Sequence, residues 1–142
     1  MPLKPKLETP IFLDWGGLRL HVRQAQMAPS VLVRFAHELD LVAQVDGQGF
    51  DPDEATLIHR VTGELVDVPM ALFDSLWRHA ELFLSGCLFV AVSDGRYSVE
   101  QARYISQLAS RLGWSAAQLA GIEAAVLEQL EQRGRARLEQ RG

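Results

Sequence analysis

The sequence predicts an all-α domain, a duplicated helix-turn-helix bundle of about five to seven helices that follows a short N-terminal β-hairpin. Three observations lead to this prediction. From residue 30 onward, apolar residues recur about every 3.6 positions, which is the period of an α-helix with one buried face. Patterns typical of helix N-termini stand before several of these apolar runs. An apolar run followed by an Asp-Gly pair occurs twice, in residues 41–54 and 88–101.

The composition limits the classes of protein to which the chain can belong. Its 142 residues suffice for one domain with a single core. The formal net charge is −4 and no basic surface is evident, so we expect no nucleic-acid partner. Cys87 is the single cysteine, which excludes a disulfide framework and favours a cytoplasmic location. We expect no secretion signal and no membrane insertion, because the longest apolar run, residues 82–92, is too short to cross a bilayer.

The N-terminal segment has a pattern of its own. Residues 1–9 are rich in Pro and Lys and are expected to form a flexible tail. In residues 10–24, two apolar arms flank Gly16-Gly17, a pair suited to a tight hairpin turn, and residues 18–23 alternate between apolar and polar. This pattern predicts a β-hairpin. Because a lone hairpin is marginal in water, we expect its apolar face to lie on the helices or to form a homodimer with a second copy.

The helical domain is predicted over residues 29–133, and its first helix begins at the N-cap residue Ser30. Glu38 is expected on the polar face of that helix. Asp51-Pro52 is typical of a second helix start, and this short helix is expected to end near Gly63. The inward stripe of the first helix is Val31, Phe35, Leu39 and Val42.

The longest helix is expected to begin at Asp67 and Pro69. Its second half is apolar nearly all round, so we place it at the centre of the bundle, where Gly86 allows a close helix crossing. Two more helices follow the N-cap motifs that begin at residues 98 and 115. Residues 134–142 are charged and are expected to form a solvated tail. The inward stripe of the longest helix is Leu72, Phe73, Leu76, Ala80, Phe83, Leu84, Cys87, Leu88 and Ala91.

The two Asp-Gly segments align with each other when one residue, Gly49, is inserted in the first. The alignment sets Asp51 beside Ser98 and Glu54 beside Gln101, so each loop leads into a helix N-terminus. Such an internal repeat indicates two helix-turn-helix halves that pack face to face, because one half alone cannot bury its apolar stripe.

The chain resembles the TerB-like family, the helical domains named for tellurite-resistance protein B. The resemblance is closest in Val90 to Gly95, Ser98 to Gln101 and Leu112-Gly113, and it covers roughly residues 30–132. It implies an all-helical, non-catalytic domain whose acidic loops hold a divalent cation or contact protein partners. Such domains join stress-response or membrane-associated assemblies.

Carried over by position, the resemblance points to the loop acids as ligands of a divalent cation, Ca²⁺ or Mg²⁺. In the second loop, Gln101 stands where the family has a Glu, and Arg96 adds a positive charge, so that loop is the weaker candidate. The alternative is that these residues only cap helices, where each stabilises the helix by about 1 kcal/mol. The candidate ligands are Asp46, Asp51, Asp53 and Glu54 in the first loop, and Asp94 and Glu100 in the second.

No pattern typical of an enzyme is present, because the sequence has no Gly-rich phosphate loop, nucleophile elbow or paired His at zinc-site spacing. Trp15, Tyr97 and Trp114 are candidate partner-binding residues if they are exposed, and packing residues if they are buried. The sequence therefore predicts a non-catalytic interaction or scaffold module that docks a protein through the acidic loops, the hairpin, or both. The alternative is a divalent-cation sensor centred on the first loop.

Overall fold

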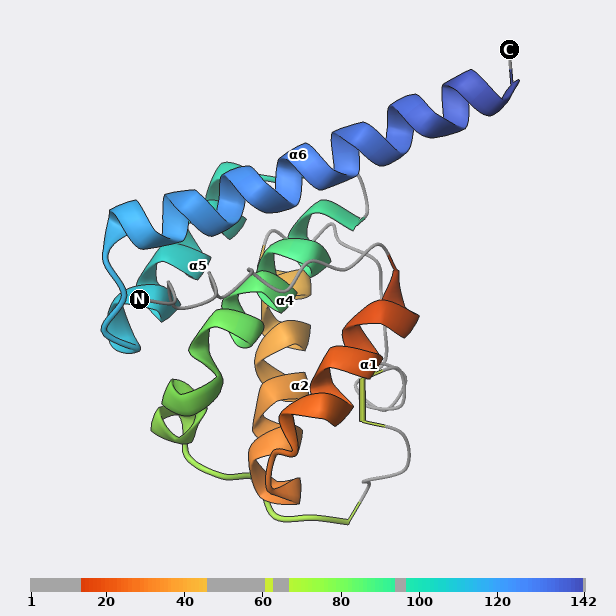
Figure 1. Ribbon diagram of the computed structural model, residues 1–142. Coiled ribbons are helices and arrows are strands. Elements are labelled where there is room, and N and C mark those ends of the chain that lie inside the picture. Colours follow the sequence, from red (N-terminus) through yellow and green to blue (C-terminus); the bar gives the residue numbers. More distant parts are fainter. Residues whose placement is uncertain (1–13, 46–60, 63–66, 94–96, 142) are drawn as a thin grey trace, which may run out of the picture.

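The computed structural model describes residues 14–45, 61–62, 67–93 and 97–141, and all regular elements in these ranges are helices (Figure 1). The predicted helical bundle is confirmed. Within the same ranges, no helix is both long enough and apolar enough to span a membrane. The elements are α1 (Trp15–Ala25), α2 (Pro29–Gln44), the 3-10 helix η1 (Phe73–His79), α4 (Ala80–Ser93), α5 (Val99–Arg111) and α6 (Ala116–Arg141).

Helix α1 stands in place of the predicted β-hairpin, and that prediction is wrong for residues 15–24. Asp14 caps the helix, because its Oδ1 accepts a hydrogen bond from the backbone N–H of Gly17 at 2.8 Å. The Gly pair that was predicted to form a turn therefore lies in the first turn of a helix. The first predicted arm, residues 10–13, and the predicted tail, residues 1–9, lie outside the described residues.

The pattern of apolar residues in α1 shows why strand and helix were confused. Leu18 and Val22 are buried, whereas Leu20 is 55% exposed. Two apolar residues four positions apart share a face in a helix and also in a strand. Only the residue between them distinguishes the two structures, and its exposure is a result of packing that the sequence pattern does not contain.

Helix α4 lies at the centre of the bundle, as predicted, and packs against α1, α2, η1, α5 and α6 (Figure 1). Its residues from Leu82 to Ala91 are all buried. Gly86 lies where α1 and α2 approach α4, since a Cβ built at this glycine would be 3.4 Å from Leu39 Cδ2 and 3.7 Å from Leu18 Cδ1. A large side chain at this position would push the helices apart.

The chain between residues 67 and 80 differs from the predicted long helix. Residues 67–72 are not helical, η1 has 3-10 geometry, and α4 begins only at Ala80. Because a 3-10 helix has about three residues per turn, Phe73 and Leu76 are buried on the same side of η1. Leu72, which was predicted to point inward, is 80% exposed.

The start of α2 also differs from the prediction. The N-cap residue is Ala28, and Pro29 occupies the first turn, where its missing N–H costs nothing. Ser30 lies inside the helix and does not cap it. Of the predicted second helix, only residues 61 and 62 are described; both are helical, and Val61 is buried.

The sequence motifs around α5 have the roles that were predicted for them. Ser98 and Gln101 form a capping box, in which the Gln101 N–H donates to Ser98 Oγ at 3.0 Å and the Ser98 N–H donates to Gln101 Oε1 at 3.1 Å. After the helix, Gly113 has a φ of 81°, and the Trp114 N–H donates to the Ala109 carbonyl at 2.9 Å. These two features define a Schellman motif, which turns the chain from α5 into α6.

Helix α6 is longer than predicted. It follows a second capping box, formed by Ser115 and Gln118, and continues through Gly134 to Arg141. The charged residues 134–142 were predicted to form a solvated tail, whereas residues 134–141 are helical. One glycine costs a helix only about 1 kcal/mol, so it does not by itself end the helix.

Candidate functional site

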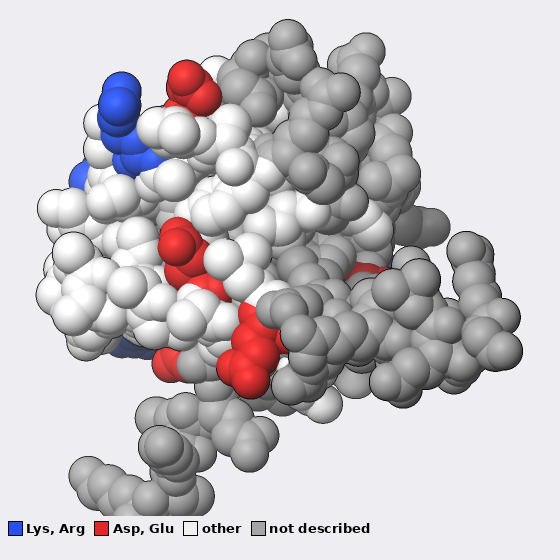
Figure 2. Space-filling model, turned by 90° about the horizontal axis from the view of Figure 1, so that it is seen from above, with Lys and Arg blue, Asp and Glu red and all other residues white. Residues whose placement is uncertain are grey.

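The acidic loop residues that the sequence analysis assigned as candidate metal ligands are mostly outside the described part of the chain. Glu100 is described, and it is exposed in the first turn of α5, where a carboxylate interacts favourably with the helix dipole. Among the described residues, no three His, Cys, Asp or Glu side chains form a group that could hold a metal ion. On the face in Figure 2, described acidic side chains lie near the middle and at one edge, and uncharged side chains fill most of the described surface. The candidates outside the described residues are Asp46, Asp51, Asp53, Glu54 and Asp94.

The described flanks of the two loops meet at Gln101. This side chain is fully buried, and its Nε2 donates a hydrogen bond to the Val42 carbonyl at 3.3 Å in the last turn of α2. Helix α5, which follows the second loop, is therefore bonded to the end of α2, after which the first loop begins. A carboxylate at this position has no N–H group to donate to the Val42 carbonyl, so the bond depends on the amide of Gln101.

The three aromatic residues proposed as partner contacts are half-buried and make contacts within the molecule. The rings of Trp15 and Phe89 meet edge to face, with centroids 5.3 Å apart. The Tyr97 hydroxyl donates to Glu123 Oε2 at 2.5 Å, and burial together with this carboxylate raises the pKa of Tyr97, so the hydroxyl stays protonated. Trp114 packs against the core.

Exposed apolar side chains that the sequence pattern does not predict lie in η1 and in the segment before it. They are Met70, Leu72 and Trp77, which are 44%, 80% and 63% exposed, and we name this set of side chains the η1 surface. An α-helical period places Trp77 on the same face as Phe73, which is the buried face. In the 3-10 helix η1, residues four positions apart do not share a face, so Trp77 does not follow Phe73 into the core. The apolar pattern, which has an α-helical period, therefore could not identify the surface.

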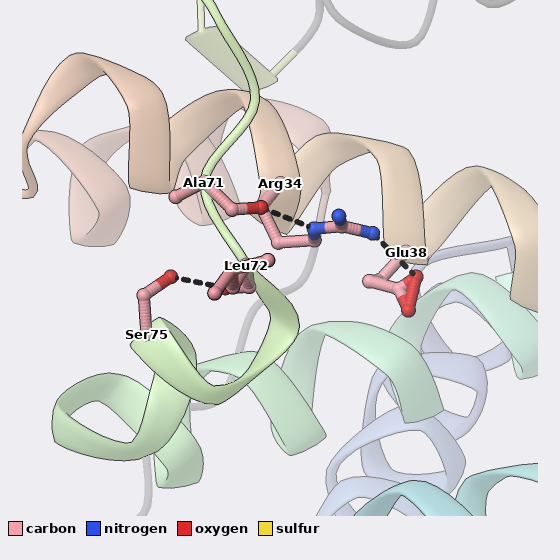
Figure 3. A network of polar contacts seen from close by, with 5 residues as sticks. All are labelled: Arg34, Glu38, Ala71, Leu72 and Ser75. Carbon is pink, nitrogen blue, oxygen red and sulfur yellow. Dashed lines mark hydrogen bonds and ion pairs between the residues drawn. The ribbon is translucent and has the colours of Figure 1, made fainter.

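Hydrogen bonds to α2 hold the backbone of the η1 surface in place (Figure 3). The Ala71 N–H donates to the Ser30 carbonyl at 3.0 Å, and Arg34 Nε donates to the Ala71 carbonyl at 2.7 Å. Next along the chain, the Leu72 carbonyl accepts from Ser75 Oγ at 2.6 Å and from the Ser75 N–H at 3.0 Å. The exposure of Leu72 is therefore a property of an ordered segment.

Arg34 also lies beside Glu38, which is buried although it was predicted to be on a polar face. The Arg34 Nη1 and Glu38 Oε2 atoms are 4.0 Å apart, and Glu38 is 4% exposed. Burial first, and then the nearby Glu38, raises the pKa of the Cys87 thiol well above its usual value. Burial and, after it, the nearby Glu38 also raise the pKa of Tyr104. The cysteine is thus an inert core residue at neutral pH.

Charged residues stand close in the sequence to the apolar residues of the η1 surface. The Arg78 guanidinium lies over the Trp77 ring, 5.3 Å from its centroid, and Asp67 and Asp74 are exposed nearby in the sequence. Burial first, and then Arg78, lowers the pKa of His79, so this side chain is neutral at pH 7. Exposed apolar and aromatic side chains with charged neighbours are common in protein–protein interfaces.

Replacing Arg34 with Met is expected to lower the free energy of unfolding by about 2 kcal/mol. The substitution leaves the Ala71 carbonyl without its side-chain donor and the buried Glu38 without its neighbouring cation. Urea denaturation measures the loss, and amide hydrogen exchange should become faster at Ala71. Arg103→Met, an exposed change on α5, is the control. Equal stability of the two variants would contradict the role given to Arg34.

A cavity of about 200 Å³ lies between α5 and α6. It is smaller than the roughly 300–1,000 Å³ of most ligand pockets, so we do not assign a ligand to it. Its lining is Ser106, Ala109, Ser110, Trp114, Ser115, Ala116 and Leu119.

Comparisons of the chain with protein-family models, with curated proteins and with solved structures found no match. The resemblance to the TerB-like domains therefore stays a prediction from the residues quoted above.

Proposed function

We propose that this domain is a non-catalytic protein-interaction module that docks a protein partner on the η1 surface. The proposal rests on the exposure of Leu72, whose side chain is 80% exposed. The backbone of the preceding residue, Ala71, is held by hydrogen bonds to α2. An apolar side chain on an ordered backbone loses little conformational entropy when it binds. Trp77 adds a residue type that is enriched among binding hot spots.

The proposal keeps the class of function predicted from the sequence and changes the surface. A docking role for the hairpin no longer applies, because residues 15–24 belong to α1. Docking by the acidic loops, and the alternative of a divalent-cation sensor at Asp46 to Glu54, concern residues outside the described part and remain predictions. The relationship to TerB-like domains is also a proposal, with which the all-helical arrangement is compatible.

Trp77→Ala and Leu72→Ser are each expected to weaken partner binding by about 30-fold, which is the effect of losing a hot-spot residue of about 2 kcal/mol. The free energy of unfolding should change by less than about 1 kcal/mol in each variant, because both side chains are exposed. Candidate partners are proteins that bind the wild-type chain and bind neither variant. Each candidate is then purified, and its dissociation constant is measured by calorimetry with all three chains.

The matched control is Val99→Ala, which removes another exposed apolar side chain, 68% exposed, at the start of α5. This variant should bind the partner as the wild type does. If Trp77→Ala and Leu72→Ser bind as tightly as the control, the η1 surface is not the docking site.

A further inference from the structure

The guanidinium of Arg78 lies over the ring of Trp77, with its Cζ atom 5.3 Å from the ring centroid. Trp77 is 63% exposed, and Arg78 is exposed as well. The contact is a cation–π interaction, in which the positive charge is attracted to the face of the ring. A molecule that covers this face of Trp77 therefore also covers the guanidinium or has to displace it.

A second guanidinium lies over Phe73, another aromatic residue of η1. The Cζ atom of Arg111 is 3.9 Å from the ring centroid of Phe73. Phe73 is buried, whereas Arg111 is exposed in the last turn of α5. The residue before Phe73 is Leu72, which is 80% exposed. Two exposed guanidinium groups are therefore held against η1 by contacts with its rings.

Both arginines also have a role in the free chain. Each is in the last turn of its helix, where a positive charge interacts favourably with the helix dipole. Among the described residues, no carboxylate forms an ion pair with Arg78 or Arg111. The charges of these two exposed groups are therefore stabilised by water, and a partner that covers the rings removes part of this water.

Covering a guanidinium without a new acceptor is unfavourable, because the group loses hydration and gains no hydrogen bond. A purely apolar partner would therefore lose at Arg78 part of the free energy that it gains at Trp77. A carboxylate removes this cost, because it carries the opposite charge and accepts two N–H donors of a guanidinium side by side. The contact between Arg78 and Trp77 thus favours a partner with an acidic group next to an apolar one.

We propose that the partner of the η1 surface docks through an acidic, apolar protein segment, in which one carboxylate binds Arg78 beside the side chain that covers Trp77. A second carboxylate of this segment binds Arg111. The inference rests on the proposed function, because it names the chemistry of the partner that docks there. It also gives the surface specificity, since a partner without carboxylates would leave covered guanidinium groups unpaired.

Two exposed carboxylates, Asp67 and Asp74, are also close in the sequence to the η1 surface. Asp74 is in the first turn of η1, where a negative charge interacts favourably with the end of the helix. An acidic partner is repelled by these carboxylates, and a basic partner is attracted by them. The sign of the effect of Asp74→Asn on affinity therefore distinguishes the two kinds of partner.

Selection of peptides on the full chain tests the proposal, with phage-displayed random peptides of about 16 residues as the probe. Peptides that bind the wild-type chain are tested again on the Trp77→Ala variant, and those that lose binding are sequenced. These peptides should carry Asp or Glu within about four positions of a Trp, Phe or Leu. A basic consensus, or an apolar consensus without acidic residues, would overturn the proposal.

Charge reversal on both sides tests the assigned contact. One selected peptide is synthesised, and its dissociation constant is measured by fluorescence anisotropy. Arg78→Glu should raise the dissociation constant at least about 30-fold, and Arg111→Glu at least about fivefold, because carboxylates would then face carboxylates. Replacing the acidic residue of the peptide with Arg should restore binding to the Arg78→Glu variant. Asp74→Asn should bind the original peptide as tightly as the wild type or more tightly.

Arg103→Glu is the matched control, because it reverses another exposed charge on α5 and should bind the peptide as the wild type does. Thermal melting confirms that each variant is folded. If Arg78→Glu binds the peptide as tightly as the wild type, the acidic partner is wrong and the η1 surface still stands as the docking site. If every selected peptide binds the Trp77→Ala and Leu72→Ser variants as tightly as the wild type, the proposed function fails as well.

Discussion

The Gln101→Glu variant is expected to have a free energy of unfolding about 3 kcal/mol below that of the wild type. The wild-type amide donates to the Val42 carbonyl from a fully buried position. A carboxylate there would bury a charge and direct one acceptor at another. Urea denaturation followed by circular dichroism measures the loss.

Gln118→Glu is the matched control for this variant. Gln118 has the same place in the capping box of α6, but its side chain is exposed. Among the described residues, none accepts a hydrogen bond from its amide as the Val42 carbonyl does from that of Gln101. The control should therefore be as stable as the wild type. If the two variants lose equal stability, the bond between Gln101 and Val42 does not have the role assigned to it.

The pH dependence of the Gln101→Glu variant has a defined sign. Burial is expected to raise the pKa of the introduced carboxyl above its value of about 4.3 in the unfolded chain. The folded state then binds a proton more tightly than the unfolded state, so the deficit relative to the wild type should shrink as the pH falls from 7 towards 5. A deficit that grows over this interval would contradict the argument.

The Phe83→Ala variant is expected to lose about 4 kcal/mol, the usual cost of truncating a buried Phe. Phe83 is fully buried in α4, and its ring meets those of Phe35 and Phe73 edge to face, with centroids 5.6 and 6.1 Å away. It therefore joins α2, η1 and α4 in one cluster. Thermal melting and urea denaturation measure the change.

Two further variants keep this prediction testable if Phe83→Ala does not fold. Phe83→Leu retains most of the side-chain volume and should lose about half as much. Trp77→Ala removes a larger aromatic ring from an exposed position and should lose less than about 1 kcal/mol. A smaller loss for Phe83→Leu than for Trp77→Ala would contradict the assignment of the core.

Those parts of the fold that depend on local patterns were predicted from the sequence. The stripe of α2 is an example, because Phe35, Leu39 and Val42 are buried as the helical period requires. The capping box of Ser98 and Gln101 also follows from residues three positions apart. In both cases, neighbours in the sequence determine the structure.

Two parts of the fold that depend on distant contacts were not predicted. The segment before η1 is non-helical where Ala71 is bonded to Ser30 and Arg34, and these partners are about 40 positions away in the sequence. In α1, the burial of Leu18 fits a helix and a strand alike, and the exposure of Leu20, which results from packing, distinguishes the helix.

The candidate site was predicted less well for the same reason. The η1 surface exists because the chain departs from the helix that its apolar pattern indicates. The buried amide of Gln101 has its role through Val42, which is far away in the sequence. By contrast, Trp15, Tyr97 and Trp114 stood out in the sequence but are half-buried in the molecule. A residue type alone does not reveal which side chains the packing leaves exposed.

Hydroxyl-radical footprinting of the chain with its purified partner tests the central claim most directly. Met70 and Trp77 are exposed in the free chain, so both should be oxidised readily. In the complex, their oxidation should fall at least about tenfold, while that of Leu20 and Val99 stays unchanged. Unchanged oxidation of Met70 and Trp77 in the complex would show that the partner does not bind the η1 surface.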